Sequence, residues 1–191
     1  LPNVMLVGDS VTISYSTKIY QGFKGKANIV KNPFNGGPSS NGVENFSTWL
    51  TLEPYKMNWE IIHFNFGLHD VKTYPKTGKP FTSLEDYEKN LRTIVKHLKK
   101  TGAKLIFATT TPLGSSDDKN PKWIWDNDKV LKYNEVAIKI MKENNVEIND
   151  LYSHMKPRLE VLQNSDGVHY TKQGSAHLAT QTIKTIQQNL K

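Results

Sequence analysis

The sequence predicts an α/β protein in which a parallel sheet is covered by helices on both faces. Short, mostly apolar runs recur along the 191 residues, as is typical of strands that are buried on both sides. Amphipathic stretches with helical periodicity separate these runs. This alternation favours parallel strands joined by right-handed crossovers. No linker or repeat interrupts it, so residues 1–191 are expected to form one domain.

Five apolar runs are predicted to be strands. Each is short, as expected of parallel strands in the middle of a domain. The predicted strands cover residues 4–7, 27–30, 61–66, 104–109 and 146–148.

The clearest helix is predicted to begin after Thr82 or Ser83 and to stop at Gly102. A hydroxyl residue followed three positions later by an acidic residue is an N-terminal capping signal, and glycine is a common C-terminal stop. The apolar stripe that we expect to be buried consists of Leu84, Tyr87, Leu91, Ile94, Val95 and Leu98.

Two further helices are predicted, and a long irregular segment lies before the first of them. Residues 128–144 are expected to turn Val130, Leu131, Ala137, Ile138 and Met141 inward. The last helix is expected to begin at Thr171 and to bury Ala179, Ile183, Ile186 and Leu190. Residues 112–126 show no periodicity and are predicted to be a loop that shapes a binding site.

The composition is typical of a globular protein, with 37% hydrophobic and 23% charged residues. No apolar run approaches the ~18 residues of a membrane helix, so stable membrane insertion is not expected. The absence of cysteine excludes disulfides and thiolate metal sites without indicating a compartment. The chain opens on Leu1-Pro2, and a removed signal peptide or a trimmed chain would both produce that start. We favour an exported protein, periplasmic or extracellular, and a cytoplasmic location stays open.

The net charge of +7 raises the question of an anionic partner. Much of the excess lies on and after one predicted helix, at Lys89, Arg92, Lys96, Lys99, Lys100 and Lys104. Cations in the later turns of a helix complement its C-terminal partial charge, so a solvated helix face is favoured over a nucleic-acid or phospholipid surface. No nucleic-acid-binding motif accompanies them, and no nucleic-acid partner is expected.

A candidate nucleophile follows the first predicted strand directly. The tripeptide Gly-Asp-Ser ends at Ser10, and Asp166 and His169 stand just before the last predicted helix. A serine hydroxyl needs a neighbouring base to take its proton, and the base needs an orienting group. Catalytic groups of parallel sheets lie beyond the carboxyl ends of strands, which is where Ser10 is placed. The alternative is an ordinary strand-to-helix loop with Ser10 or Thr12 as N-cap.

Four blocks together resemble the SGNH, or GDSL-type, esterase and lipase superfamily. They are Gly8-Asp9-Ser10, residues 32–40, Gly67-Leu68-His69-Asp70 and Asp166-Gly167-Val168-His169. Segments 109–112 and 149–151 are also similar to the family, so the likeness covers nearly the whole chain. It implies a flavodoxin-like three-layer α/β/α sandwich with about five parallel strands. It also implies Ser10 as nucleophile, His169 as base, Asp166 as its orienter, no metal and no organic cofactor.

The resemblance further implies an oxyanion hole built from three donors. These are the Ser10 N–H, a glycine N–H in the second block and an asparagine side chain in the third. Gly37 is the best match for the glycine, although the register could slip to Gly36 or the pair could form a plain turn. In the third block His69 stands where the family has asparagine, and an imidazole N–H can also donate to an oxyanion. The alternative donor is Asn65 on the preceding strand.

The remaining polar residues of interest are assigned structural roles. Carboxylates beside catalytic positions usually fix loops through backbone N–H groups, which is our expectation for Asp9 and Asp70. Histidines within elements are expected to pack or face solvent, which concerns His63, His97 and His177. His154 follows the last strand and could approach the pocket, but no carboxylate at metal spacing accompanies it.

Trp123 and Trp125 stand in the segment 120–126 of the predicted loop. Alternation in an extended chain would put both indoles on one side, which gives a flat apolar surface with N–H donors that suits a sugar ring. The alternative is that one indole anchors the loop against the core.

The sequence therefore favours a serine esterase that removes a small acyl group, with acetyl preferred, from a carbohydrate ester. A lysophospholipase or acyl thioesterase is the second hypothesis, favoured only by the basic surface. A non-catalytic carbohydrate-binding derivative, in which the altered third block marks lost activity, is the third. No feature of the sequence specifies an oligomeric state.

Overall fold

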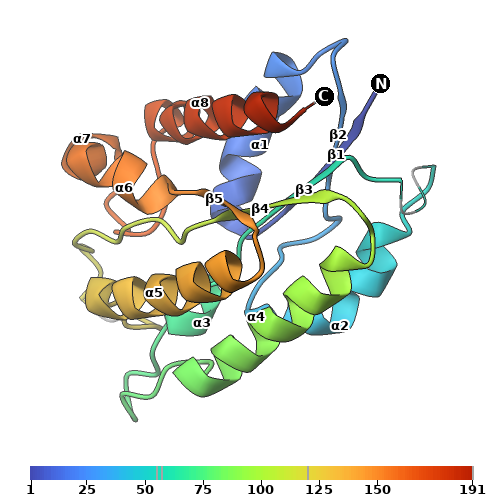
Figure 1. Cartoon of the computed structure of the whole chain (residues 1–191). Helices are drawn as coiled ribbons and strands as arrows, with labels where there is room; N and C mark the ends of the chain where they lie inside the picture. The colour runs from blue at the N-terminus through green and yellow to red at the C-terminus, as the bar shows by residue number, and fades with distance from the viewer. Residues whose placement is uncertain (55, 57, 120, 191) are drawn as a thin grey trace.

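The computed structural model describes residues 1–54, 56, 58–119 and 121–190. Within these residues one sheet of five parallel strands has the order β2-β1-β3-β4-β5 (Figure 1). The strands are β1 Asn3–Val7, β2 Asn28–Lys31, β3 Ile61–Phe64, β4 Lys104–Ala108 and β5 Glu147–Asn149. This is the flavodoxin-like order, in which the chain leaves β1 in one direction and later crosses to β3 on its other side. The predicted fold class is confirmed.

Helices cover both faces of the sheet, which completes three layers (Figure 1). On one face α1 (Ser10–Gly22) packs against α8 (Lys172–Asn189). On the other face α4 (Leu84–Lys99) lies between α2 (Ser39–Leu50) and α5 (Asn127–Glu143). The short helices are α3 (Leu68–Val71), α6 (Leu151–Met155), η1 (Lys156–Arg158) and α7 (Leu159–Leu162).

The predicted helix starts are confirmed by their caps. The Ser83 hydroxyl accepts the Asp86 N–H at 3.0 Å and begins α4. The Thr171 hydroxyl accepts the Gly174 N–H at 3.1 Å and begins α8. Each cap satisfies one of the N–H groups that the first turn of a helix leaves without an internal partner.

Two predicted core positions are wrong. Leu84 is 38% exposed because it is the first residue of α4, and Leu131 is 45% exposed. The inward face of α5 is instead fixed by Asn134, whose amide accepts the Thr110 N–H at 2.8 Å and donates to the Thr110 carbonyl at 2.8 Å. Because Asn134 lies on the buried side of α5, the side of the helix that faces the core differs from the one that the apolar residues indicate. Ile138 is accordingly only half-buried.

Helix α2 is not evident from the sequence, because its Ser, Asn and Gly residues favour turns over helices. Tertiary packing supports it instead, since Phe46, Trp49 and Leu50 are buried. Gly42 lies so close to Phe66 that an added Cβ would be 2.7 Å from the ring. The helix therefore approaches the sheet more closely than a larger residue would allow.

A buried histidine lies within the sheet. His63 on β3 is fully buried, and its Nε2 lies 3.1 Å from Nδ2 of Asn149. Its Nδ1 has no hydrogen-bond partner among the described residues. Burial lowers the pKa of His63 to about 4, so the ring is neutral at neutral pH.

This burial predicts a pH dependence of stability. Between pH 4 and 6.5 the unfolded chain binds more protons at His63 than the folded chain, so the stability from this site is present above pH 6.5 and lost as the pH falls towards 4. In His63→Leu this loss should be absent, so its free energy of unfolding should fall by up to roughly 3 kcal/mol less than that of wild type as the pH is lowered. The measurement is the free energy of unfolding in urea from pH 4.5 to 7.5.

If His63→Leu and wild type differ by a constant free energy across this range, the titration of His63 does not contribute.

Candidate active site

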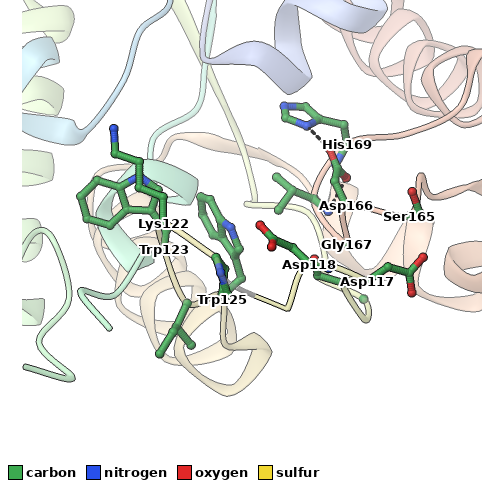
Figure 2. Close-up of a pocket in the computed structure, with 14 residues that line it drawn as sticks. Asp117, Asp118, Lys122, Trp123, Trp125, Ser165, Asp166, Gly167 and His169 are labelled. Atoms are coloured by element: carbon green, nitrogen blue, oxygen red, sulfur yellow. Dashed lines mark hydrogen bonds and ion pairs between the residues drawn. The ribbon is translucent and has the colours of Figure 1, made fainter. Parts of the chain in front are cut away.

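The structure brings Ser10, Asp166 and His169 together from opposite ends of the chain. Ser10 is the first residue of α1, directly after β1. Its Oγ lies 2.8 Å from Nε2 of His169. Nδ1 of the same ring lies 2.6 Å from Oδ2 of Asp166, and Figure 2 shows this contact beside a hollow. The hydroxyl, imidazole and carboxylate form the linear arrangement through which a serine can lose its proton.

Asp166 is held in an ionised state that orients the ring. Burial alone would raise the pKa of Asp166, but N–H groups of Val168 and His169 at 2.9 and 2.8 Å, with the His169 ring, hold it below its usual value. A carboxylate at Nδ1 favours the tautomer that carries its hydrogen there. Nε2 is then free to accept the hydrogen of Ser10.

The local chain around Ser10 is constrained on both sides. An added Cβ at Gly8 would lie 2.1 Å from Oγ1 of Thr12, so only glycine fits before the helix. Asp9 is buried and its Oδ1 accepts the Val11 N–H at 2.9 Å, which confirms the predicted loop-fixing role. Ser10 therefore stands at the N-terminus of a helix, where free N–H groups and the helix dipole favour an anion.

The second block is bound to the chain just before the nucleophile. The Asn32 amide accepts the Gly8 N–H at 3.2 Å and donates to the Gly8 carbonyl at 3.3 Å. Gly36 N–H also donates to the Gly8 carbonyl, at 2.9 Å. The N–H of Gly36 is thus engaged by the backbone. Gly37 has a φ of +63°, and its N–H donates to the exposed side chain of Asn35 at 2.9 Å. Of the two glycines, Gly37 is the one whose N–H can exchange its partner for a ligand.

The third block places His69 on α3, half-buried and within electrostatic reach of Asp9 and His169. Burial lowers the pKa of His69, against the attraction of Asp9. A neutral imidazole with one N–H to donate is the result at neutral pH. Asn65 instead donates from Nδ2 to the Ala108 carbonyl at 2.8 Å and to Thr110 Oγ1 at 3.4 Å. Its amide hydrogens are committed within the protein interior, which leaves His69 the better candidate donor.

Asp70 joins the third block to the second. Its carboxylate accepts the Ser39 N–H at 3.0 and 3.1 Å and the Ser39 hydroxyl at 2.6 Å. The prediction that this carboxylate fixes a loop is confirmed. Burial raises the pKa of Asp70 to about 6, although these hydrogen bonds oppose the shift.

The two tryptophans line a hollow beside Asp166 and His169. A hollow of about 580 Å³ extends from Asp166 and His169 to Trp123 and Trp125 (Figure 2). Trp125 packs partly against the core, so the alternative that one indole anchors the loop also holds. Asn120, at the start of the predicted segment, lies outside the described residues. The same hollow contains Asp117, Asp118 and Lys122, which no motif in the sequence indicates.

The other histidines do not join the site. His154 and His177 stack on each other with ring centroids 3.9 Å apart, and each Nε2 lies near the other's carbonyl oxygen. In the described part of the chain, no group of three or more His, Asp or Glu side chains could hold a metal ion. Nor is any described helix both long and apolar enough to cross a bilayer.

Sequence reasoning missed the clamp that Asn32 forms and the partner of the Gly37 N–H. Asn32 opens the second block, so the motif contains it, but its hydrogen bonds to Gly8 depend on two strands lying side by side. The acceptor role of Asn35 left no signal in the sequence, because a single exposed asparagine next to glycines is also an ordinary turn.

Fold and site together define a class, the three-layer α/β hydrolases with a serine, histidine and aspartate at the carboxyl edge of the sheet. A model of the GDSL-like lipase/acylhydrolase family matches residues 6–177. The chain belongs to this family. A GDSL esterase/lipase, WDL1, from Oryza sativa subsp. japonica is 24% identical over 145 residues, which is 71% of this chain. The chain spans 55% of the length of that curated relative.

Several solved structures have the same fold. The acetyl xylan esterase AlAXEase has a TM-score of 0.77 at 19% identity, covering 96% of this chain and 99% of that one. A lipase/acylhydrolase from Enterococcus faecalis has a TM-score of 0.78 at 18% identity, covering 100% and 98%. An acetylxylan esterase from Geobacillus stearothermophilus has a TM-score of 0.77 at 17% identity, covering 97% and 94%. At these identities the likeness establishes the fold.

Asp70 predicts a pH dependence opposite in sign to that of His63. Its folded pKa of about 6 lies above the ordinary 3.8, so its contribution to stability is complete below pH 3.8 and is lost as the pH rises through 6. Asp70→Asn keeps an oxygen acceptor for Ser39 but cannot ionise. From pH 4 to 7 the variant should gain up to roughly 3 kcal/mol relative to wild type in urea unfolding.

A free-energy difference between Asp70→Asn and wild type that is independent of pH would contradict this prediction.

Proposed function

We propose that the protein is a serine esterase that removes a small acyl group, with acetyl preferred, from a carbohydrate ester. The observation that carries the proposal is the continuous contact from the Ser10 hydroxyl through the His169 ring to the Asp166 carboxylate. Membership of the GDSL-like lipase/acylhydrolase family supports the reaction class.

The reaction follows from this geometry. Ser10 Oγ attacks the ester carbonyl while His169 Nε2 takes its proton, and Asp166 stabilises the resulting imidazolium. The tetrahedral intermediate collapses, its C–O bond to the sugar breaks, and His169 returns the proton to the leaving sugar oxygen. Water then loses a proton to His169 and attacks the acyl-enzyme, which releases the carboxylic acid and restores Ser10.

Three donors are proposed to stabilise the oxyanion. The Ser10 N–H lies at the N-terminus of α1, where a developing negative charge is favoured. Gly37 would offer its N–H when the Asn35 side chain releases it. His69 would donate from a neutral ring, since burial lowers its pKa.

The substrate class rests on the shape and chemistry of the hollow. The indoles of Trp123 and Trp125 beside polar groups suit a sugar ring, which has apolar faces and a hydroxylated rim. A long acyl chain would instead need an extended apolar groove. Two solved structures with this fold are described as acetylxylan esterases, which supports a small acyl group on a carbohydrate.

Ser10→Ala should lower ester hydrolysis by roughly 10⁴-fold or more, because the three groups act as a unit. His169→Ala should cost nearly as much, and Asp166→Asn less. The measurement is turnover of p-nitrophenyl esters from acetate to octanoate, together with circular dichroism to check the fold.

Ser14→Ala, one turn further along α1, is the matched control and should keep full activity. Preference for acetate would support the proposed acyl group, and preference for octanoate would favour the lysophospholipase or thioesterase hypothesis. Turnover of Ser10→Ala within tenfold of wild type would exclude Ser10 as the nucleophile. An inactive wild type would favour the non-catalytic hypothesis.

His69→Ala should lower kcat by ~10² to 10³, the effect of losing one oxyanion donor. His69→Asn should restore a large part of the loss, because an amide N–H can occupy nearly the same place. KM should change little in either variant, since the donor acts on the transition state. Full activity of His69→Ala would reduce the proposed hole to two donors.

A further inference from the structure

A basic and aromatic surface adjoins the hollow, on the hairpin that spans residues 72–81. Its aromatic side chains are Tyr74, Phe81 and Trp123, whose ring centroids lie 4.8 to 6.2 Å apart. Its cations are Lys72, Lys76, Lys79 and Lys122. We call this set of seven side chains the hairpin platform. A second hollow of about 660 Å³ lies along it.

Backbone hydrogen bonds hold the platform in place beside the tryptophan loop. Thr73 and Ile124 exchange two N–H to carbonyl bonds, both of 2.9 Å. Within the hairpin, Tyr74 N–H donates to the Lys79 carbonyl at 2.9 Å. Lys129 also donates from Nζ to the Thr73 hydroxyl at 2.7 Å. The backbone of the platform is therefore fixed before a ligand arrives, which lowers the entropic cost of binding.

Lys72 is half-buried, and the other three platform lysines are exposed. Lys72 Nζ lies 4.3 Å from the ring centroid of Phe81 and 4.4 Å from that of Trp123. Burial lowers the pKa of Lys72, the Asp70 carboxylate opposes this shift, and the nearby Lys122 lowers the pKa further. Among the described residues, the ion pairs within 4.0 Å include none of the platform lysines. An anion bound here would relieve this repulsion.

The second hollow adjoins the first, which reaches Asp166 and His169. Lys122 lines both hollows. The far end of the first hollow contains the carboxylates of Asp117, Asp118 and Asp166, opposite Lys122 in Figure 2. Charge thus changes sign along the path, from positive on the hairpin to negative around the triad.

We propose that the hairpin platform binds the acidic part of an acylated oligosaccharide, namely the carboxylates of uronic acid residues. This inference rests on the proposed function. The exposed parts of Tyr74 and Phe81 offer apolar surface to sugars, and the lysines offer point charges to carboxylates. The aspartates at the other end disfavour a charged sugar there. The acylated, uncharged sugar then lies at Ser10 and the uronate at the hairpin.

An anionic membrane surface is the competing occupant of such a patch. The rings do not project as free apolar tips, because they pack on one another and on Lys72. Tyr74 and Phe81 are 42% and 39% exposed. Continuity with the hollow at His169 also favours a chain-like ligand over a flat surface.

The test measures binding of unacetylated tetragalacturonate and of uncharged xylotetraose by calorimetry on the wild-type protein. Neither ligand has an ester, so the result is independent of turnover. Tetragalacturonate should bind at least roughly tenfold more tightly at low salt, and the difference should shrink in 0.5 M NaCl because salt screens exposed charges.

The double variant with Lys76→Gln and Lys79→Gln should weaken tetragalacturonate binding by roughly fivefold to tenfold, because it loses two exposed ion pairs to the ligand. The control pair Lys89→Gln and Lys96→Gln removes the same charge from α4 and should change affinity less than twofold. Equal binding of the two tetramers, or equal losses in both variant pairs, would overturn the proposal. Sedimentation with phosphatidylglycerol vesicles in preference to tetragalacturonate binding would also overturn it, in favour of a membrane surface.

The two proposals fail separately. Binding of tetragalacturonate without hydrolysis of any ester would support the proposal for the platform and contradict the proposed esterase function. Ester hydrolysis together with equal binding of both tetramers would support the proposed esterase function and contradict the proposal for the platform.

Discussion

The pairing of the Asn32 amide with the Gly8 backbone is the interaction on which the candidate site depends. Gly8 precedes the nucleophile by two residues, and Asn32 holds both its N–H and its carbonyl. Gly36 adds a third hydrogen bond to the same carbonyl. Because β1 and β2 are neighbours in register, one buried side chain can fix the nucleophile turn and the glycine loop together. A buried amide without these partners would cost about 1–3 kcal/mol, so the clamp is also a condition of folding.

The other blocks are joined by the same kind of contact. Asp70 ties the third block to Ser39, and His169 ties the fourth block to Ser10. Polar hydrogen bonds, which are directional, therefore set the relative positions of segments that apolar packing alone would hold only loosely. The sheet provides the common edge at which these segments meet.

Most of the architecture could be predicted where the local signal is strong. Helix α4 has a capping hydroxyl and an apolar stripe, and Ser83, one of the two caps that the sequence predicts, begins it. Helix α2 was missed because its residues are poor helix formers and its stability comes from packing. The phase of α5 was misjudged because Asn134 occupies a buried position for the sake of Thr110. Lys72 and Lys122 meet only because the strand-like contact between Thr73 and Ile124 brings distant segments together, which no local pattern encodes.

The contact between Gly37 and Asn35 gives the resting site an internal mimic of its substrate. The Asn35 amide oxygen is a carbonyl acceptor, as is the ester oxygen that the proposed mechanism would bring to the same N–H. Binding would then exchange one acceptor of the Gly37 N–H for another. The number of hydrogen bonds would stay the same, and the Gly37 N–H would keep a partner throughout. This hydrogen bond helps the loop to keep its shape, and in the proposed mechanism an ester carbonyl has to displace the Asn35 oxygen. A weakly accepting or badly placed carbonyl would lose that competition, and discrimination would begin before any bond is broken.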